Sequence, residues 1–374
     1  MAATMGLVAF APGVASARNA TAENRFTQTN LVSDQAGVAQ LQDPHLVNAW
    51  GIAALPNGPI WVSNNNGVDV PGGPNVSTVY SGGVNGSTVM GPLLDVTIPG
   101  GRVSTGDNSS PTGQVANTTQ GFTVTSASGS GPAAFIFDSE SGQISAWNPT
   151  ADPIGAGGLS TATLESSSPT AVYKGLAEAT GPNGPDLFAA NFHDGTVDVF
   201  DSSFQPVTPS GGLFAFQDPT IPAGFAPFGI QADPSGSFLF VTYAKQDAAK
   251  ATDVPGRGLG FIDVYTTSGV LVGRFAQGQE LNAPWGVAFA PAGFGPFGGD
   301  VIVGNFGDGR INVFSPFGRF IDRLRSQNGK PLVIDGLWGL LPGNSTFGGV
   351  GSLIFSAGPD DESHGLLGTL TPAS

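Results

Sequence analysis

A glycine near the start of a short apolar run recurs along this chain at a near-regular spacing. It stands at positions 51, 113, 175, 229, 286 and 339, so successive copies are 62, 62, 54, 57 and 53 residues apart. Each copy opens a segment of apolar and β-branched runs separated by Gly, Pro and Asp, which is the pattern of strands joined by turns. A step of this size with four strands is typical of a β-propeller blade. The sequence therefore predicts an all-β, six-bladed propeller of four-stranded antiparallel blades.

The repeat is clearest in residues 281–324, where APWGVAF, DVIVGN, GRINVF and GRFIDRL follow one another. In the third segment we expect strands at residues 174–180, 186–191, 195–200 and 212–218. The fourth segment carries an insertion at residues 245–258, and loops of this kind often carry function. No stretch has apolar residues at sustained spacings of three to four, so no long helix is expected.

The last segment supplies only three strands, whereas residues 25–33 read as an isolated strand near the other end of the chain. An open ring would expose a sheet edge, so we expect the N-terminal strand to complete the sixth blade. Residues 25–374 are then one propeller domain. Residues 1–24 are read as a signal-peptide remnant and linker, because an apolar run leads to the small-residue box Ala15-Ser16-Ala17.

Charge and composition narrow the possible partners. The chain of 374 residues has 28 acidic and 13 basic side chains, a formal net charge of −15, which argues against nucleic acid or an anionic membrane as partner. It has no cysteine, which removes disulfides, thiolate metal sites and cysteine nucleophiles. No apolar stretch is long enough to span a membrane. We expect a secreted or periplasmic monomer whose ligand is a small molecule, a glycan or a peptide.

Three histidines are the scarcest potential ligands in the chain. Strand phasing places His45, His193 and His364 on one face of the propeller, where three imidazoles could hold zinc with an open position. The turn that contains His364 also carries Asp360 and Glu362, whose oxygens suit calcium. The alternative is that these are solvated turn residues, since Asp and Gly are what turns need in any case.

Other side chains could act as acid, base or anion-binding group. Lys174, Tyr243 and Arg257 are the candidates, and the alternative for each is a surface or interface role. We expect Trp50, Trp285 and Trp338, which precede the repeated glycine, to pack in the core or to line the channel. No nucleotide cofactor is expected, because the Gly-rich run at residues 293–298 contains Pro296 and leads into a strand instead of a helix.

The blade segments resemble six-bladed propellers of the NHL, streptogramin-lyase and gluconolactonase type, and above all an uncharacterised family of exported bacterial propeller proteins. The resemblance lies in NAWGI at 48–52, APWGV at 283–287, GNFGDG at 304–309, and FSAGP at 355–359 with its acidic continuation. It implies the architecture and no particular activity, because propellers host many functions. It also implies that a histidine-bound zinc near the axis is possible, as in peptide-amidating lyases.

Two functions follow as hypotheses. The first is a metal-assisted hydrolase or lyase that uses zinc or calcium as Lewis acid on a small neutral or cationic substrate. The second is a non-catalytic propeller that binds a glycan, a peptide or a cell-surface partner.

Overall fold

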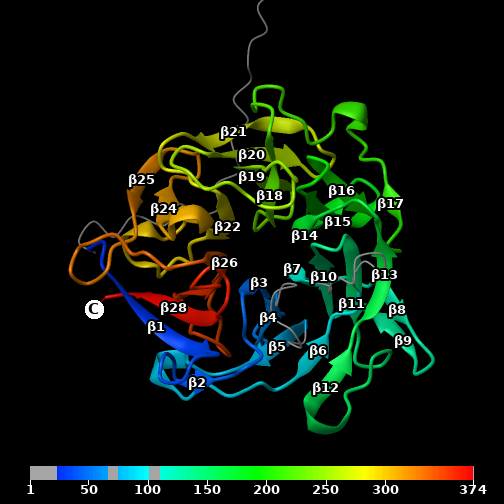
Figure 1. Ribbon diagram of the computed structural model, residues 1–374, viewed down its shortest axis with the longest axis horizontal. Helices are drawn as coiled ribbons and strands as arrows, with labels where there is room; N and C mark the ends of the chain where they lie inside the picture. Colours follow the sequence, from blue (N-terminus) through cyan, green and yellow to red (C-terminus); the bar gives the residue numbers. More distant parts are fainter. Residues whose placement is uncertain (1–22, 66–74, 101–109, 374) are drawn as a thin grey trace, which may run out of the picture.

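The computed structural model describes residues 23–65, 75–100 and 110–373, and in them the chain forms six β-sheets arranged as blades around an axis (Figure 1). The all-β, six-bladed prediction is confirmed. The predicted signal-peptide segment lies almost wholly outside the described residues. Within those residues no helix has the length and apolar character needed to cross a bilayer.

The blades follow the chain, and each inner strand starts at a repeated glycine segment. Blade one is β3 (Ala49–Ala53), β4 (Ile60–Asn64), β5 (Val76–Tyr80) and β6 (Asp95–Thr97); blade two is β7 (Pro111–Ala116), β10 (Phe135–Ser139), β11 (Gln143–Trp147) and β13 (Thr163–Ser167). Blade three is β14 (Tyr173–Gly181), β15 (Gly184–Asn191), β16 (Thr196–Phe200) and β17 (Pro206–Val207); blade four is β18 (Phe225–Ala232), β19 (Phe238–Lys245), β20 (Gly260–Thr266) and β21 (Leu271–Gln277). Blade five is β22 (Pro284–Phe289), β23 (Val301–Asn305), β24 (Ile311–Phe314) and β25 (Phe320–Arg323).

Short additional elements decorate this frame. β2 (Leu41–Gln42) pairs with β1 (Phe26–Ser33), β12 (Leu159–Thr161) extends blade one, and β8 (Thr123–Thr125) forms a hairpin with β9 (Ser130–Pro132). The helical elements of the described chain are single 3₁₀ turns: η1 (Val84–Gly86), η2 (Ala156–Gly158), η3 (Gly212–Phe214), η4 (Gly295–Phe297) and η5 (Phe306–Asp308).

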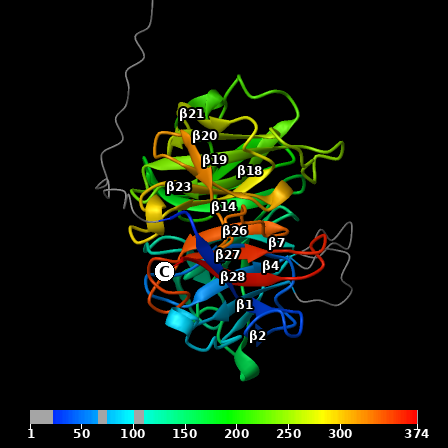
Figure 2. The same ribbon diagram turned by 90° about the vertical axis from the view of Figure 1, so that its left-hand side faces the viewer.

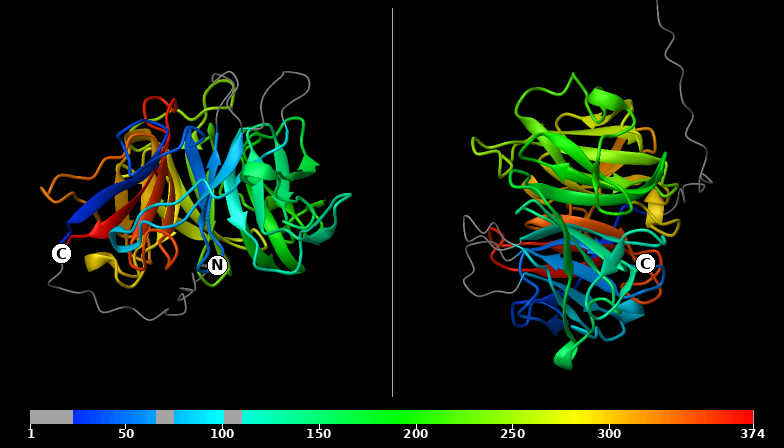
Figure 3. Two further views of the ribbon diagram at one scale, coloured as in Figure 1. Left: turned by 90° about the horizontal axis from the view of Figure 1, so that it is seen from below. Right: turned by 90° about the vertical axis from the view of Figure 1, so that its right-hand side faces the viewer.

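The N-terminal strand closes the ring, as predicted. Blade six consists of β26 (Leu337–Pro342), β27 (Leu353–Ala357), β28 (Leu366–Pro372) and β1, which pairs antiparallel with β28 from Phe26 opposite Pro372 to Ser33 opposite Leu366. Figure 2 shows these four strands one after another, and Figure 3 shows β1 running beside β28 with the blades seen edge-on. The two ends of the propeller are thus held by one hydrogen-bonded pair, which leaves β28 without an open edge.

The repeated glycines mark where the inner strands approach one another most closely. A Cβ atom on Gly51 would lie 2.5 Å from the Thr112 carbonyl oxygen of the next blade, and one on Gly229 would lie 2.3 Å from the Trp285 carbonyl oxygen. Equivalent contacts recur around the ring up to Gly339, whose Cβ would meet the Trp50 carbonyl oxygen at 2.7 Å. Glycine is required here by the narrow waist of the propeller, which explains its period in the sequence.

The core is divided among the blade interfaces. Six apolar clusters lie between neighbouring blades, for example Phe240 and Val264 of blade four against Val301 and Phe314 of blade five. A seventh cluster, which includes Trp50 and Trp338, lies on the axis. Each blade buries both faces against its neighbours, which accounts for strands that are apolar along most of their length.

The predicted fourth strand of blade three, at residues 212–218, is wrong. The two-residue β17 occupies that place, and residues 212–214 form η3. Phe216 adopts a positive φ of 56° and packs its ring 5.9 Å from Phe188 and 5.4 Å from Tyr265, inside the interface between blades three and four. The apolar run is therefore not a strand: Phe216 fills the interface core, whereas Phe214 is 79% exposed.

Candidate functional site on the propeller axis

An aromatic floor lies on the axis, built from the residues that precede the repeated glycines. The rings of Trp50 and Trp338 stack with centroids 3.6 Å apart, and Phe306 stacks on the other face of Trp338 at 3.9 Å. Trp285 meets both tryptophans edge-on, at 6.1 and 5.7 Å. Trp50 and Trp338 are buried and Trp285 is partly exposed, so the expectation that these tryptophans pack in the core or line the channel is confirmed.

Asn48 ties this floor together. Its side-chain oxygen accepts hydrogen bonds from the indole nitrogens of Trp50 (2.9 Å) and Trp338 (3.1 Å), which satisfies two buried donors at once. Its amide nitrogen donates to Glu362 at 2.7 Å. Asn48 has a φ of 45°, a left-handed conformation that asparagine tolerates better than most residues. The residue therefore joins the aromatic floor to a carboxylate.

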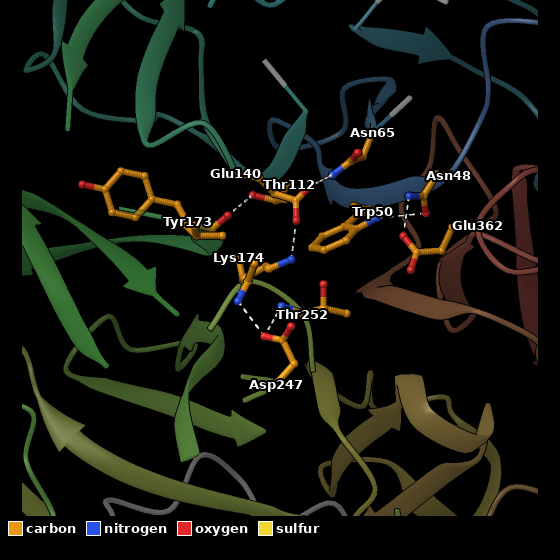
Figure 4. Close-up of polar contacts among 12 residues, drawn as sticks. Asn48, Trp50, Asn65, Thr112, Glu140, Tyr173, Lys174, Asp247, Thr252 and Glu362 are labelled. Atoms are coloured by element: carbon orange, nitrogen blue, oxygen red, sulfur yellow. Dashed lines mark hydrogen bonds and ion pairs between the residues drawn. The ribbon is translucent and has the colours of Figure 1, made fainter. Parts of the chain in front are cut away.

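Lys174 places a buried ammonium group above this floor. The side chain is 4% exposed, its Nζ lies 5.1 Å from the centroid of Trp50, and it forms an ion pair with Glu140 (Figure 4). The other carboxylate oxygen of Glu140 accepts from the Asn65 amide at 3.0 Å. The free face of Trp50 is thus already used as a cation-binding surface, with Lys174 as the cation.

Asp253 reaches the site from the insertion of blade four. It is 8% exposed, and its Oδ2 has no hydrogen-bond partner in the part of the chain that the structure describes. Burial raises the pKa of Asp253 to about 6, and the charge of Lys174 opposes that shift. The insertion is held in shape by Asp247, whose Oδ1 accepts from the backbone N–H groups of Ala251 (2.9 Å) and Thr252 (3.2 Å) (Figure 4).

Glu362 is aimed at the site by a left-handed turn between β27 and β28. Asp360, Asp361 and Glu362 have φ values of 56°, 53° and 65°, three consecutive residues in a region that L-residues other than glycine rarely occupy. Burial raises the pKa of Glu362, the Asn48 hydrogen bond lowers it, and the charge of Glu140 raises it further. Strain of this kind concentrates at functional sites.

These residues form the axial site, defined as Asn48, Trp50, Glu140, Lys174, Asp253, Trp285, Trp338 and Glu362. All six blades contribute to it, blades two and four through loop residues and not through their inner strands. Three carboxyl groups face one ammonium group on an aromatic floor. The pKa values of Asp253 and Glu362 are raised because burial destabilises their charged forms, and Lys174 compensates only in part. Chemically the site can bind a cation or exchange a proton near neutral pH.

His45 and His364 pair with different carboxylates. The His45 Nδ1 lies 2.8 Å from the Asp95 carboxylate, and the His364 Nδ1 lies 2.7 Å from that of Asp34. The segments of His45 and His364 are neighbours, because the Asn48 N–H donates to the His364 carbonyl at 3.0 Å. Within residues 23–65, 75–100 and 110–373, no group of three or more His, Asp or Glu side chains is arranged to hold a metal ion. The predicted zinc or calcium site stays a prediction.

The remaining predicted site residues lie apart from the axis, with the exception of Lys174 and Glu362. Asp360 is exposed, and Arg257 is exposed with its Nε 3.3 Å from the Gln279 carbonyl. Tyr243 is buried in the interface of blades three and four, where its hydroxyl lies 2.8 Å from that of Tyr265. Burial raises the pKa of Tyr243 well above its usual value, so the phenol stays protonated at neutral pH.

Sequence reasoning missed Glu140 and Asp253. Glu140 follows β10 in the same kind of turn that carries His193 and Glu362 in other blades, so its place in the repeat was a usable signal. Asp253 lies in the insertion of blade four, where the sequence had singled out Arg257 instead. Only the side-chain directions distinguish these two acids from ordinary turn residues.

Comparison with known proteins gives relatives of unknown activity. No protein-family model matches the chain. One uncharacterised protein of Acanthamoeba polyphaga mimivirus is 31% identical over 345 residues, covering 91% of this chain and 78% of its own length. A second uncharacterised protein of the same virus is 33% identical over 347 residues, covering 91% and 84%. These relatives are viral, so the bacterial and exported part of the predicted resemblance has no support from them.

Solved propellers resemble the chain at low sequence identity. A streptogramin B lyase is 13% identical, with 93% of this chain and 97% of that chain covered and a TM-score of 0.48. A gluconolactonase from Xanthomonas campestris is 18% identical, with 64% and 73% covered and a TM-score of 0.41. At these values the likeness gives no information about activity.

Proposed function

The chain belongs to the same family as the two uncharacterised mimivirus proteins, and we propose that it is a propeller that binds a small cationic or neutral polar molecule at the axial site. The single observation that carries the proposal is the imbalance of charge: Glu140, Asp253 and Glu362 face Lys174 alone. A cationic ligand would restore the balance, and the partly exposed ring of Trp285 would contact its apolar parts.

The pKa shifts predict how the binding of a cation depends on pH. Burial raises the pKa of Asp253 to about 6 and raises that of Glu362 above its usual value. A bound cation favours the ionised form of both acids, so binding should release protons near pH 6 and tighten as the pH rises through that value. A neutral ligand would show the opposite preference or none.

Calorimetry with defined probes tests the proposal. Methylammonium, choline and glucose are titrated into the wild type and into Glu362→Gln, which keeps a hydrogen-bond acceptor for Asn48 and removes the charge. We expect saturable binding of at least one probe, and for a cation a loss of about tenfold in Glu362→Gln, because a charge-assisted contact contributes about 1.5 kcal/mol or more.

Asp361→Asn is the matched control, since Asp361 is an exposed acid in the same turn. It should change the affinity less than twofold. The proposal fails if no probe binds saturably, or if Asp361→Asn weakens binding as much as Glu362→Gln does.

A second candidate function is acid–base catalysis, as in a hydrolase or lyase. It is favoured by one observation, the buried and unpaired Oδ2 of Asp253 with its pKa raised to about 6, which suits a general base near neutral pH. Turnover of small esters or lactones with a rising limb near pH 6, abolished in Asp253→Asn, supports it. Dependence of that turnover on added Zn²⁺ or Ca²⁺ would favour the metal-assisted form; turnover that persists in Asp253→Asn refutes this role.

A further inference from the structure

Blade three lacks most of its outer strand. β17 has two residues, whereas β21 has seven and β13 has five. β16 pairs with β17 only at Val199 opposite Val207 and Phe200 opposite Pro206. In the described part of the chain no strand pairs with Thr196–Asp198 on this side, so three residues of β16 form a free sheet edge.

The reason the strand ends can be read from its register. The Asp201 N–H donates to the Gln205 carbonyl at 2.9 Å, so the backbone groups of Asp201 point toward the outer strand. Because this direction alternates along a strand, the backbone groups of Val199 and Val197 point the same way. Continuing the pairing would put Val197 opposite Pro209, which has no N–H to donate. The chain's own outer strand therefore stops where the Val197 backbone still offers a donor and an acceptor.

A cavity of about 560 Å³ lies at this edge. It touches Asp198 and Phe200, which face blade two, and also Val197 and Val199, which face blade four. Because successive side chains of a strand point to opposite faces, a space that contacts both sets lies at the edge of the sheet. Residues 166–169 and 215–217 close it on the two sides, and β17 marks its place at the outer rim in Figure 1.

The polar group of this cavity is a carboxylate without a cation. Asp198 accepts hydrogen bonds from the Tyr173 hydroxyl (3.1 Å), the Asn191 amide (3.0 Å) and the Thr196 hydroxyl (2.8 Å). No ion pair joins it to any residue that the structure describes. Three neutral donors thus hold a negative charge at the wall of a largely apolar groove, which includes the exposed Val207.

We propose that this groove binds an extended peptide segment of a partner protein, which adds to β16 as the missing outer strand of blade three and points a Lys or Arg side chain at Asp198. The free edge supplies main-chain hydrogen bonds, and the alternation of Asp198 with Val197 and Val199 supplies specificity. The net charge of −15 also favours a basic segment. The site is separate from the axial site and does not depend on its function.

A peptide library tests this proposal. Random heptapeptides displayed on phage are selected on the full-length wild type and counter-selected on Thr208→Trp, which fills the groove from an exposed position on its wall. We expect enrichment of peptides that alternate β-branched residues with a Lys or Arg. One enriched peptide, synthesised with a fluorescent label, should bind at least fivefold more weakly to Asp198→Asn and less than twofold more weakly to the remote Asp361→Asn.

Strand addition requires main-chain hydrogen bonds between the peptide and β16, whereas a simple charge contact does not. N-methylation of the peptide nitrogen that faces β16 should weaken binding at least tenfold, because it removes a main-chain hydrogen bond. The proposal is overturned if no enriched peptide distinguishes the wild type from Thr208→Trp, or if N-methylation at every position has no effect.

Discussion

Replacing Gly229 with alanine tests the physical basis of the six-fold repeat. The new Cβ would lie 2.3 Å from the Trp285 carbonyl oxygen of the next blade, about 1.1 Å inside the 3.4 Å at which ordinary contacts begin. Gly229 does not have a positive φ, so the cost is steric and falls on backbone atoms that cannot rotate away. Overpacking of this kind costs about 3 kcal/mol. In a domain of this size that corresponds to a fall in Tm of about 4 °C.

Two other glycines in the same protein calibrate the result. At Gly175 the nearest atom to a new Cβ lies at 3.2 Å, so Gly175→Ala should cost less than Gly229→Ala. At Gly273, in β21, nothing lies within 4 Å, and Gly273→Ala should be neutral or stabilise by about 0.5 kcal/mol by restricting the unfolded chain. Urea unfolding followed by tryptophan fluorescence measures all three. The steric account is refuted if Gly229→Ala unfolds at the same urea concentration as Gly273→Ala.

Three further predictions concern titration, strain and closure. Burial raises the pKa of Asp138 to about 7 from 3.8, so the folded state binds an extra proton between these pH values, and the unfolding free energy should fall as the pH rises from about 4 to 7. The Tm should fall with it, and Asp138→Asn should make this fall less steep; an equally steep fall in the variant contradicts the assignment. Asp361→Gly should raise stability by about 0.5 kcal/mol in thermal unfolding because it removes a left-handed Asp, and a lower Tm would show that the turn is unstrained. Deletion of residues 26–33 removes the partner of β28, so size-exclusion chromatography and circular dichroism should show self-association or loss of the fold; a monomeric, fully folded product would contradict the closure argument.

The fold was predictable because its main constraint is local in the sequence. In five of the six inner strands a Cβ at the repeated glycine would lie within 3 Å of another atom, so the repeat is visible without any side-chain pattern between blades. The closure of the ring by the N-terminal strand was predictable because the last segment has only three strands of its own. The prediction at residues 212–218 failed because LFAF looks like an apolar strand. Phe216 is apolar because it fills the interface between blades three and four, and the sequence does not distinguish an apolar strand residue from an apolar loop residue in the core.

The axial site was only partly predictable, because its chemistry depends on burial and direction. Lys174 stood out by its place before a repeated glycine, and Glu362 by the acidic turn. The histidines were candidates because they are scarce. His45 and His364 each pair with an aspartate distant in the sequence, Asp95 and Asp34, and no local sequence pattern predicts such pairs. Glu140 and Asp253 looked like ordinary turn and loop acids until the folded chain turned them inward.

The left-handed turn links the energetics of the scaffold to the site. Holding three consecutive non-glycine residues at positive φ costs about 3 kcal/mol in total, and the type I′ and II′ turns common in hairpins place at most two residues there. The contacts that hold the turn are specific: Asn48 donates to Glu362, and the Asp335 carboxylate accepts from the Asp360 N–H at 2.9 Å. Because Asn48 also binds both buried indole nitrogens, the strained acid and the aromatic floor are fixed by one side chain. The strained turn therefore holds Glu362 against Asn48 and within reach of the Lys174 charge.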